Sequence, residues 1–351
     1  MSAAVLFENV DIVFGHRPER ALPLIDAGHS RDDIARKTDN VVGVANASLA
    51  VEEGEILVLM GLSGSGKSTL MRAVNGLAPV TRGRVAVETD HGPVDPYHTP
   101  AKVLRDLRMH TVSMVFQQFA LLPWRSVAEN VGFGLELAGM KAAERKRRVE
   151  QQLELVNLSQ WANHPVAALS GGMQQRVGLA RAFATGAPIL LMDEPFSALD
   201  PLIRSHLQDE LLDIQRRLRK TILFVSHDLD EAFKLGNRIA IMEGGRIIQC
   251  GTPREIVSRP ANSYVFDFVQ NMNPINMLTA ADVMQPSTAP DGLRASVAGT
   301  ARPETPLLDI LDVIAGSEGS IGVVDHGRIV GTISARDIVS GLTVHRKQDR
   351  D

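Results

Sequence analysis

The chain has 351 residues, of which 44% are apolar and 22% charged, as expected for a globular protein of about two domains. The formal net charge of −4 gives no general attraction to nucleic acid or to anionic lipid. The single cysteine, Cys250, excludes an internal disulfide framework.

No apolar run approaches the roughly 20 residues that a membrane-spanning helix needs. The segment 1–10 carries Glu8 and Asn9 and lacks the basic-then-apolar order of a signal peptide. We therefore expect a cytoplasmic protein with no nucleic-acid partner. Any role at a membrane would come through a partner protein.

The first part of the chain predicts strands interrupted by a polar segment. Residues 5–14 show a strand pattern, and so do residues 41–51. The segment between them, about 16–43, is polar and charged, and we interpret it as an insertion with one short helix near 30–37. The apolar run 56–60 predicts the central strand.

This run leads into Gly61-Leu62-Ser63-Gly64-Ser65-Gly66-Lys67-Ser68-Thr69, which matches the phosphate-loop pattern G-x-x-x-x-G-K-[ST] between a strand and a helix. The glycines let several backbone N–H groups point at one place, where the dipole of the following helix adds to them. Lys67 would bring a full charge to the β- and γ-phosphates of ATP, and Ser68 would offer its hydroxyl to Mg²⁺. The candidate ATP-binding residues of this loop are Gly61, Ser63, Gly64, Ser65, Gly66, Lys67, Ser68 and Thr69.

The rest of the first 250 residues alternates predicted strands and helices, which favours an α/β core with a mostly parallel sheet. The period becomes helical from 126 to 168, where Val127, Val131 and Leu135 are spaced by four. We expect an inserted helical subdomain at about 118–185. The other predicted elements are strands at 84–88, 112–116, 189–192 and 221–225, a helix at 203–218, and a hairpin at 239–249.

Two further stretches suggest chemistry. The apolar run 189–192 ends in Asp193 and Glu194, and functional groups of a buried parallel strand lie at its carboxyl end. Asp193 would hold Mg²⁺, and Glu194 would orient or deprotonate an attacking water. A strand that simply ends in a polar turn is the alternative. The second stretch, Leu169-Ser170-Gly171-Gly172-Met173-Gln174-Gln175-Arg176, is a glycine loop opening a helix; it could receive an anion from a second chain, or be an ordinary serine N-cap.

In this order, the motifs resemble those of the nucleotide-binding subunit of an ATP-binding cassette (ABC) transporter over residues 5–275. The resemblance identifies Walker A at 61–69, the Q-loop at Gln117, the signature at 169–176, Walker B at 189–194, the D-loop at 197–200 and the H-loop at 226–228. It implies a P-loop NTPase fold with an antiparallel β segment, and a homodimer that encloses two ATP molecules with Mg²⁺.

The resemblance also implies roles for single residues. Glu194, His227 and Gln117 would be catalytic, with His227 at the γ-phosphate. Ser68, Gln117 and Asp193 would surround Mg²⁺. Phe14 would stack on adenine, with Val44 as the alternative contact. The residues expected to face ATP from the other chain are Ser170, Gly171, Gly172, Gln174 and Asp200.

Finer features resemble the ATPases of importers for glycine betaine, choline and related quaternary amines, and among them the choline-type members. These features are the insertion at 16–43 and the stretches 60–63, 173–181 and 196–204. The resemblance implies a permease partner in the membrane, an indirect substrate-binding protein and a peripheral place on its cytoplasmic face. Leu122-Pro123-Trp124 departs from the family pattern, which often has His after Phe-Pro. Trp124 is either an exposed contact for the permease or a core residue of the helical subdomain.

The tail, 276–351, resembles a single cystathionine-β-synthase (CBS) repeat, a small α+β regulatory domain. Ser334 and Asp337 match ribose-contacting positions of such repeats, although Ser-x-x-Asp is also a helix capping box. Ile321, Val323, Ile329, Ile333 and Ile338 are expected to leave an apolar face open for a second copy.

Two other classes of protein remain as alternatives. A non-transport ABC ATPase acting on DNA or ribosomes usually carries tandem cassettes or coiled-coil arms, and this chain shows one cassette and no sustained heptads. A regulatory module whose main function lies in the tail would not need the complete catalytic set. An importer for another small solute is a third possibility within the transport class.

Overall fold

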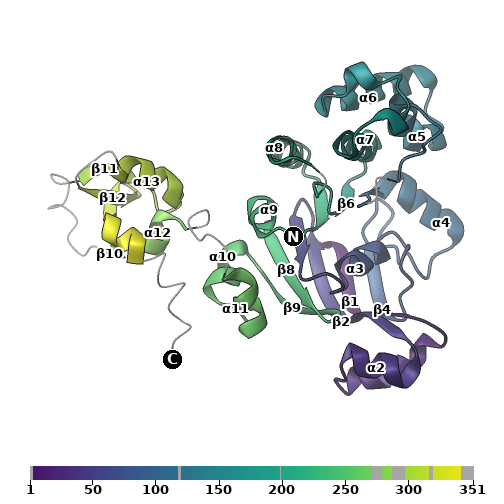
Figure 1. Ribbon diagram of the computed structural model, residues 1–351, viewed down its shortest axis with the longest axis horizontal. Helices are drawn as coiled ribbons and strands as arrows, with labels where there is room; N and C mark the ends of the chain where they lie inside the picture. The colour runs from purple at the N-terminus through teal and green to yellow at the C-terminus, as the bar shows by residue number, and fades with distance from the viewer. Residues whose placement is uncertain are drawn as a thin grey trace. The chain divides into compact units, whose positions relative to one another are not determined.

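The computed structural model describes residues 3–117, 120–197, 199–270, 278–286, 297–315 and 319–340. The chain divides into two compact units, one ending at Thr252 and the other beginning at Pro253 (Figure 1). The predicted domain division at 275 and 276 falls outside the described residues and stays a prediction. Within the described part of the chain, no helix is long and apolar enough to cross a membrane.

The first unit is built on a six-stranded sheet in the order β5-β6-β7-β3-β8-β9. All neighbouring strands run parallel except the last pair, β8 and β9. The bounds are β3 Ile56–Met60, β5 Val112–Val115, β6 Ile189–Asp193, β7 Thr221–Val225, β8 Arg238–Glu243 and β9 Arg246–Gly251. Because β3, β6 and β7 are buried along their whole length, their unbroken apolar sequences fit the centre of a covered parallel sheet.

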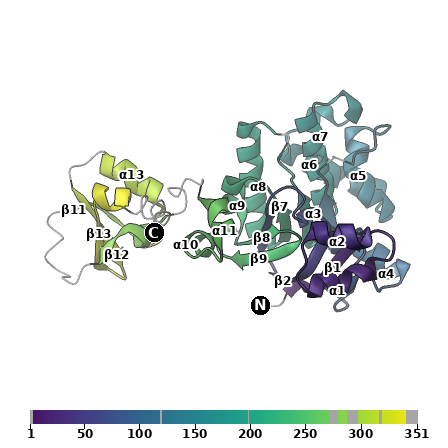
Figure 2. The ribbon, with the colours of Figure 1, turned by 60° about the horizontal axis from the view of Figure 1, so that its bottom comes forward.

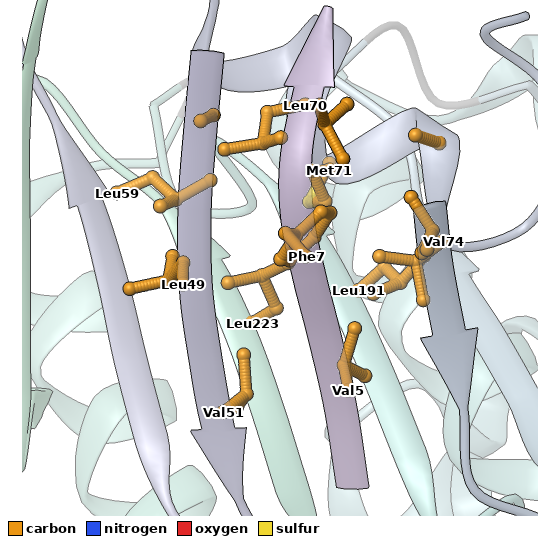
Figure 3. Packing of buried hydrophobic residues seen from close by; sticks show 14 of the residues in the cluster. Val5, Phe7, Leu49, Val51, Leu59, Leu70, Met71, Val74, Leu191 and Leu223 are labelled. Atoms are coloured by element: carbon orange, nitrogen blue, oxygen red, sulfur yellow. The ribbon is translucent and has the colours of Figure 1, made fainter. Parts of the chain in front are cut away.

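A second, three-stranded antiparallel sheet packs over this one in the order β2-β1-β4. Its strands are β1 Ala3–Phe14, β2 Val41–Glu52 and β4 Arg82–Val87. Figure 3 shows Phe7 of β1 next to Met71, which, like Leu70, comes from helix α3, Lys67–Ala73. Leu49 of β2 belongs to the same buried cluster. The helix that begins in the phosphate loop is therefore held inside the main core, between the two sheets.

The insertion is more ordered than the sequence predicts. The expected helix is present as α2, Arg31–Thr38, and it is preceded by a 3₁₀ turn, Pro18–Ala21, and by the short helix α1, Leu22–Asp26. These elements lie beside β1 and β2 (Figures 1 and 2) and share a small core of their own. The sequence did not predict α1 because it has only five residues and no apolar period.

Arg82 of β4 holds the insertion to the antiparallel sheet. Its guanidinium contacts the fully buried Asp11 of β1 at 2.7 Å and donates two hydrogen bonds to Asp26 at the end of α1, at 2.9 and 2.7 Å. The second carboxylate is exposed over 58% of its side chain. The bound carboxylates raise the pKa of Arg82, so this cation keeps its charge throughout the usual pH range.

The predicted helical subdomain is present. Its helices are α5 Val127–Leu137, α6 Ala142–Leu155 and α7 Gly171–Ala184, joined by short 3₁₀ turns at Ser159–Trp161 and Val166–Ala168. Figure 1 shows the three helices gathered beside β6. Ser126 and Glu129 form a reciprocal capping box that fixes the start of α5. The sequence did not predict α4, Ala101–Asp106, or the π-helical turn Leu107–Thr111 that follows it.

The predicted helix at 203–218 is α8, Pro201–Leu218, and β7 is followed by α9, Leu229–Leu235. The second unit begins with two helices and continues with a four-stranded sheet in the order β10-β13-β12-β11. Its elements are α10 Pro253–Ser258, α11 Ser263–Val269, α12 Ala280–Val283, β10 Gln285–Pro286, β11 Val297–Ala301, α13 Leu307–Ala315, β12 Ser320–Asp325 and β13 Arg328–Ile333. Residues 335–340 are also helical.

The expectation of an open apolar face on this unit is wrong. Ile321, Val323, Ile333 and Ile338 are buried in the unit's own core, where they pack with Leu307 and Ile310 of α13. Ile329 is buried as well. The larger hydrophobic side chains that do remain exposed among the described residues of this unit are Leu308, Val313 and Val339. The second unit therefore has a closed core of its own, because α13 packs against the residues that the sequence pattern left open.

The two carboxylates on Arg82 give a matched stability test. We expect Asp11→Ala to lower the free energy of unfolding by about 2–3 kcal/mol, because it removes a buried charged acceptor that also binds the Asn46 N–H. Asp26→Ala should change it much less, because that pair lies in solvent. Urea unfolding followed by circular dichroism measures both. Equal effects of the two substitutions would contradict this assignment.

Candidate functional site

Three neighbouring strands, β6, β7 and β3, end at the same edge of the main sheet. The phosphate loop, 61–69, follows β3, and Asp193 and Glu194 come at the end of β6. Ser226 and His227 follow β7. The parallel register therefore gathers three of the predicted motifs at one edge of the sheet, where the carboxyl ends of parallel strands place functional groups.

A cavity of about 510 Å³ opens at this edge. It combines the phosphate loop with residues from several other parts of the first unit. The residues that line it are Phe14, Arg31, Val41, Gly43, Ser63, Gly64, Gly66, Lys67, Ser68, Thr69, Gln117, Glu194 and His227. Phe14 is 41% exposed and lines the cavity, whereas Val44 is fully buried in the core, so Phe14 is the better placed of the two candidates for contact with a base.

The phosphate loop is held tightly where it must turn. Gly66 has φ of 101° and precedes α3, and a Cβ atom there would lie 2.4 Å from the Gly43 carbonyl oxygen. A Cβ on Gly61 would lie 2.2 Å from the Met242 carbonyl oxygen. Side chains at these two positions would therefore push the loop away from β2 and β8.

Lys67 is buried, and its ammonium donates hydrogen bonds to the carbonyl oxygens of Gly61 and Leu62, at 2.8 and 3.0 Å. Burial lowers the pKa of Lys67, while the carboxylates of Glu194 and Asp193 act in the opposite direction. Among the described residues, the hydrogen-bond acceptors of this buried cation are carbonyl oxygens, so a phosphate oxygen would compensate its charge.

Two further observations fit a phosphate ligand. The hydroxyl of Ser65 is buried and has no hydrogen-bond partner among the described residues. A Cβ built on Gly64 would meet nothing within 4 Å, so the backbone of the loop is open at this position. Together with Lys67, these features leave room and polar groups for a polyphosphate at the N-terminus of α3.

Asp193 is fully buried and already has two partners. The Ser68 hydroxyl donates to its Oδ1 at 2.6 Å, and the Arg72 guanidinium donates to its Oδ2 at 2.9 Å. Hydroxyl and carboxylate oxygens are ligands that Mg²⁺ prefers. Within the described residues, no group of three or more His, Cys, Asp or Glu side chains can hold a metal by itself. These two groups therefore fit a metal that arrives with the oxygens of its ligand.

Glu194 contacts two other residues of the site through its side chain. Its Oε2 accepts a hydrogen bond from the Gln117 side-chain amide at 3.1 Å and lies 3.1 Å from Nδ1 of His227. Its backbone is fixed as well, because its N–H donates to the Val225 carbonyl oxygen and its own carbonyl accepts from Gln175. The φ of 47° places a non-glycine residue in the left-handed region, a strained conformation that is often found at functional sites.

The second glycine loop lies apart from this cavity. Ser170 is the N-cap of α7 and accepts from the Met173 N–H, with Gly171 and Gly172 as the first helical residues. Gln174 donates to the carbonyl oxygens of Val166 and Leu169. Asp200 is the N-cap of α8 and accepts from the Ile203 N–H. None of these residues lines the described cavity of its own chain.

Sequence reasoning missed two cations of the site, Arg31 and Arg72. Arg72 follows the phosphate loop by one helical turn, so its ion pair with Asp193 follows from the position of α3 beside β6. Arg31 comes from the insertion, and its position against the phosphate loop follows only from the fold. The serine N-cap before it, Ser30, was the only local signal.

Comparisons with known proteins identify the family of the chain. The family profile described as ABC transporter matches residues 44–197. The chain is 43% identical to the glycine betaine/proline betaine transport system ATP-binding protein ProV of Escherichia coli, over 99% of this chain and 85% of that protein. It is 40% identical to the trimethylamine N-oxide transport system ATP-binding protein TmoW of Ruegeria pomeroyi, over 95% of each chain.

Solved structures give the same result for the first part of the chain. A dimeric structure of a bacterial ABC transporter cassette superposes with a TM-score of 0.62 at 29% identity, over 71% of this chain and 99% of that one. A dimeric post-hydrolysis cassette bound to ADP and Pi gives 0.61 at 30% identity, over the same shares. The fold, the site and these relatives show that this chain belongs to the ABC transporter family, as an ATP-binding subunit of the betaine group with the site of an ATP hydrolase.

Proposed function

We propose that this chain is the ATP-hydrolysing subunit of an importer that takes up a small quaternary amine through a membrane permease. The observation that carries the proposal is the position of Glu194, whose carboxylate lies between Gln117 and His227 in a cavity bounded by the phosphate loop. A carboxylate there can accept a proton from a water, or orient it, against the γ-phosphate of ATP.

The other groups of the cavity have complementary roles in this proposal. Lys67 and the N-terminus of α3 stabilise negative charge on the β- and γ-phosphates. His227 contacts the γ-phosphate, and Phe14 stacks on the adenine. Bound Mg²⁺, held by Ser68, Asp193 and Gln117, would supply a positive charge at the oxygens of the transferred phosphoryl group. Asp193 already lies 2.6 Å from the Ser68 hydroxyl, which supports this assignment.

The functional unit in this proposal is a homodimer. The loop with Ser170, Gly171 and Gly172 begins a helix, so its N–H groups and dipole can bind an anion, yet it does not line the cavity of its own chain. A second copy of the chain would bring Gln174 and Asp200, with this loop, against the nucleotide of the first. The dimeric cassettes that resemble this chain support the arrangement.

The surface around Trp124 is the proposed contact for the permease. Trp124 is 78% exposed, so the interpretation of it as a core residue is wrong. It borders a cavity of about 830 Å³ on α5 and α6, where Arg125 contacts Glu136 at 2.6 Å and lies over the Phe133 ring. An exposed tryptophan at the edge of a hollow is a typical anchor for a partner protein. The surface follows Gln117 closely in the chain, which links it to the nucleotide site.

The substrate class rests on the relatives. They are described as transporters of glycine betaine and proline betaine, of glycine betaine and carnitine, and of trimethylamine N-oxide. Another relative, 41% identical over a shorter stretch, 69% of this chain, is described as a spermidine/putrescine import ATP-binding protein, which keeps another small solute as the alternative. The choline-type resemblance and the substrate-binding protein stay predictions. The permease would hold this subunit at the cytoplasmic face of the membrane.

The second unit is proposed to be a regulatory repeat of the CBS type. Strands β11 and β12 are parallel, and β13 pairs with β12 in the antiparallel direction. With helix α13 they form the small α+β domain that such a repeat needs. Ser334 and Asp337 form a capping box: the Ser334 N–H donates to the Asp337 carboxylate at 2.8 Å and the Asp337 N–H donates to the Ser334 hydroxyl at 3.3 Å, while Gln285 donates to the same carboxylate. These bonds favour a structural role over ribose binding for the pair.

The catalytic role of Glu194 has a direct test. We expect Glu194→Gln to keep ATP binding and to lower the rate of ATP hydrolysis by roughly 10²–10³, because the amide cannot accept the proton of the water. Phosphate release and equilibrium binding of MgATP measure the two effects separately. Hydrolysis at the wild-type rate would contradict the role of this residue and, with it, the proposed function.

The shared site has a test in mixed dimers. Ser170→Arg should abolish hydrolysis without weakening binding of MgATP to the phosphate loop, since the substitution blocks closure of the partner's site. Lys67→Ala should abolish binding in its own chain. A hybrid of the two variants holds one intact composite site, so part of the activity should return on mixing. Full activity of the Ser170→Arg protein alone would exclude a site shared between chains.

The permease contact is tested with the two tryptophans of the helical subdomain. Trp124→Ala should impair transport far more than basal ATPase activity, because the side chain is exposed and away from the cavity of the nucleotide. Trp161→Ala is the control, because Trp161 is only partly exposed and packs on His164. Uptake by reconstituted vesicles and ATPase activity are measured together. An equal loss of both activities in Trp124→Ala would count against this surface.

A further inference from the structure

The insertion at 16–43 sends one side chain to the phosphate loop. Arg31, the first residue of α2, donates from Nε to the Val42 carbonyl oxygen at 2.6 Å and from Nη2 to that of Gly43 at 2.8 Å. Its Nη1 donates to the carbonyl oxygen of Gly64, in the middle of the phosphate loop, at 2.6 Å. One guanidinium thus joins the insertion, β2 and the phosphate loop.

Several contacts hold the insertion around Arg31 in place. Ser30 caps α2 by accepting from the Asp33 N–H, and Ile34 of the same helix is buried. The neighbouring helix α1 is bound at its C-terminal end, where Arg82 contacts Asp26 and Arg246 donates to the Ile25 carbonyl oxygen. The insertion is therefore bound to both sheets, through Arg82 of β4 and Arg246 of β9, and Arg31 extends from it to the phosphate loop.

The position of the three acceptors explains what this contact does. A carbonyl oxygen that points into an anion site repels phosphate, whereas one held by a cation is turned away and partly neutralised. Gly64 has φ of 77°. Because glycine has no side chain, the peptide group at this position could also adopt another orientation. A guanidinium with three fixed N–H directions selects one orientation of these carbonyls.

Gly43 extends the effect to the other end of the cavity. A Cβ on Gly43 would lie 2.8 Å from the Phe14 ring and 3.0 Å from the Thr69 methyl group. Arg31 binds the carbonyl oxygen of this closely packed residue. It therefore fixes the segment of β2 that lies between Phe14, the candidate adenine contact, and the phosphate loop.

The charge of Arg31 is only partly compensated. Within the described residues, the ion pairs do not include Arg31, and its three bonds to carbonyl oxygens leave two of its five N–H groups. Burial lowers the pKa of Arg31 from its ordinary value, which reflects the cost of holding this cation away from water. It lines the same cavity as Lys67, so a polyphosphate would compensate both cations at once.

We propose that Arg31 is a positioning residue for the nucleotide, which fixes the phosphate loop against β2 through the fork of its guanidinium and makes the insertion a part of the ATP site. The inference rests on the proposed function of the site and goes beyond it, since it assigns a role to a segment outside the cassette motifs.

The test compares three variants of the full chain. Arg31→Ala removes the fork and the charge, and Arg31→Lys keeps the charge and removes the fork. Arg36→Ala is the matched control, because Arg36 lies on the same helix and pairs with Asp33 in solvent. Equilibrium binding of MgADP, KM and kcat for MgATP, and thermal unfolding without nucleotide are measured for each variant.

We expect Arg31→Ala to raise the Kd of MgADP and the KM of MgATP roughly ten-fold or more, the size of effect for hydrogen bonds to a charged group. The value of kcat should fall much less, because Glu194 and its partners are untouched. Arg31→Lys should resemble Arg31→Ala rather than the wild type, since an ammonium cannot bind three carbonyls in a fixed plane. Arg36→Ala should resemble the wild type.

Wild-type affinity in Arg31→Ala would overturn the inference, and wild-type affinity in Arg31→Lys would overturn the role of the fork. If Arg31→Ala does not fold, Arg31→Lys alone tests the inference, and wild-type affinity for MgADP in that variant would overturn it. A wild-type protein that binds neither MgADP nor MgATP would instead refute the proposed function. The two failures are therefore distinguishable.

Discussion

The register of three parallel strands is the constraint on which the rest of the site depends. Strand β7 pairs in parallel with β6 on one side and with β3 on the other, so the residues that follow the three strands lie at one edge of the sheet. A slip of one residue in β6 would turn Asp193 away from Ser68 and Glu194 away from His227. The apolar sequences of these strands therefore determine the geometry of the proposed catalytic groups, although none of their apolar side chains lines the cavity at this edge.

Much of this arrangement could be predicted from the sequence, because its signals are local. The phosphate loop stands between an apolar run and a helix, and the two carboxylates end another apolar run. The order of the motifs then resembles a family whose fold is regular. The placement of Phe14, Gln117, Glu194 and His227 around one cavity agrees with that resemblance.

The parts that could not be predicted depend on contacts between distant segments. Nothing near Arg31 in the sequence indicates that its side chain binds Gly64, because 33 residues separate them. The closed core of the second unit was missed for a similar reason, since the strand pattern of Ile321 and Val323 does not say which helix covers them. The exposure of Trp124 also depends on how α5 and α6 leave a hollow beside it.

The ion pair between Arg72 and Asp193 has a consequence for the order of events in the site. Asp193 is fully buried, and a bare carboxylate in that position would be costly. Arg72 serves as a counter-ion from the same chain and lowers this cost. A free divalent cation would gain little from a carboxylate that is already neutralised, and it would have to displace a group attached to the same chain. In the proposed function, the site would therefore take Mg²⁺ together with the phosphates, as one ligand, and Arg72 would again neutralise Asp193 after they leave.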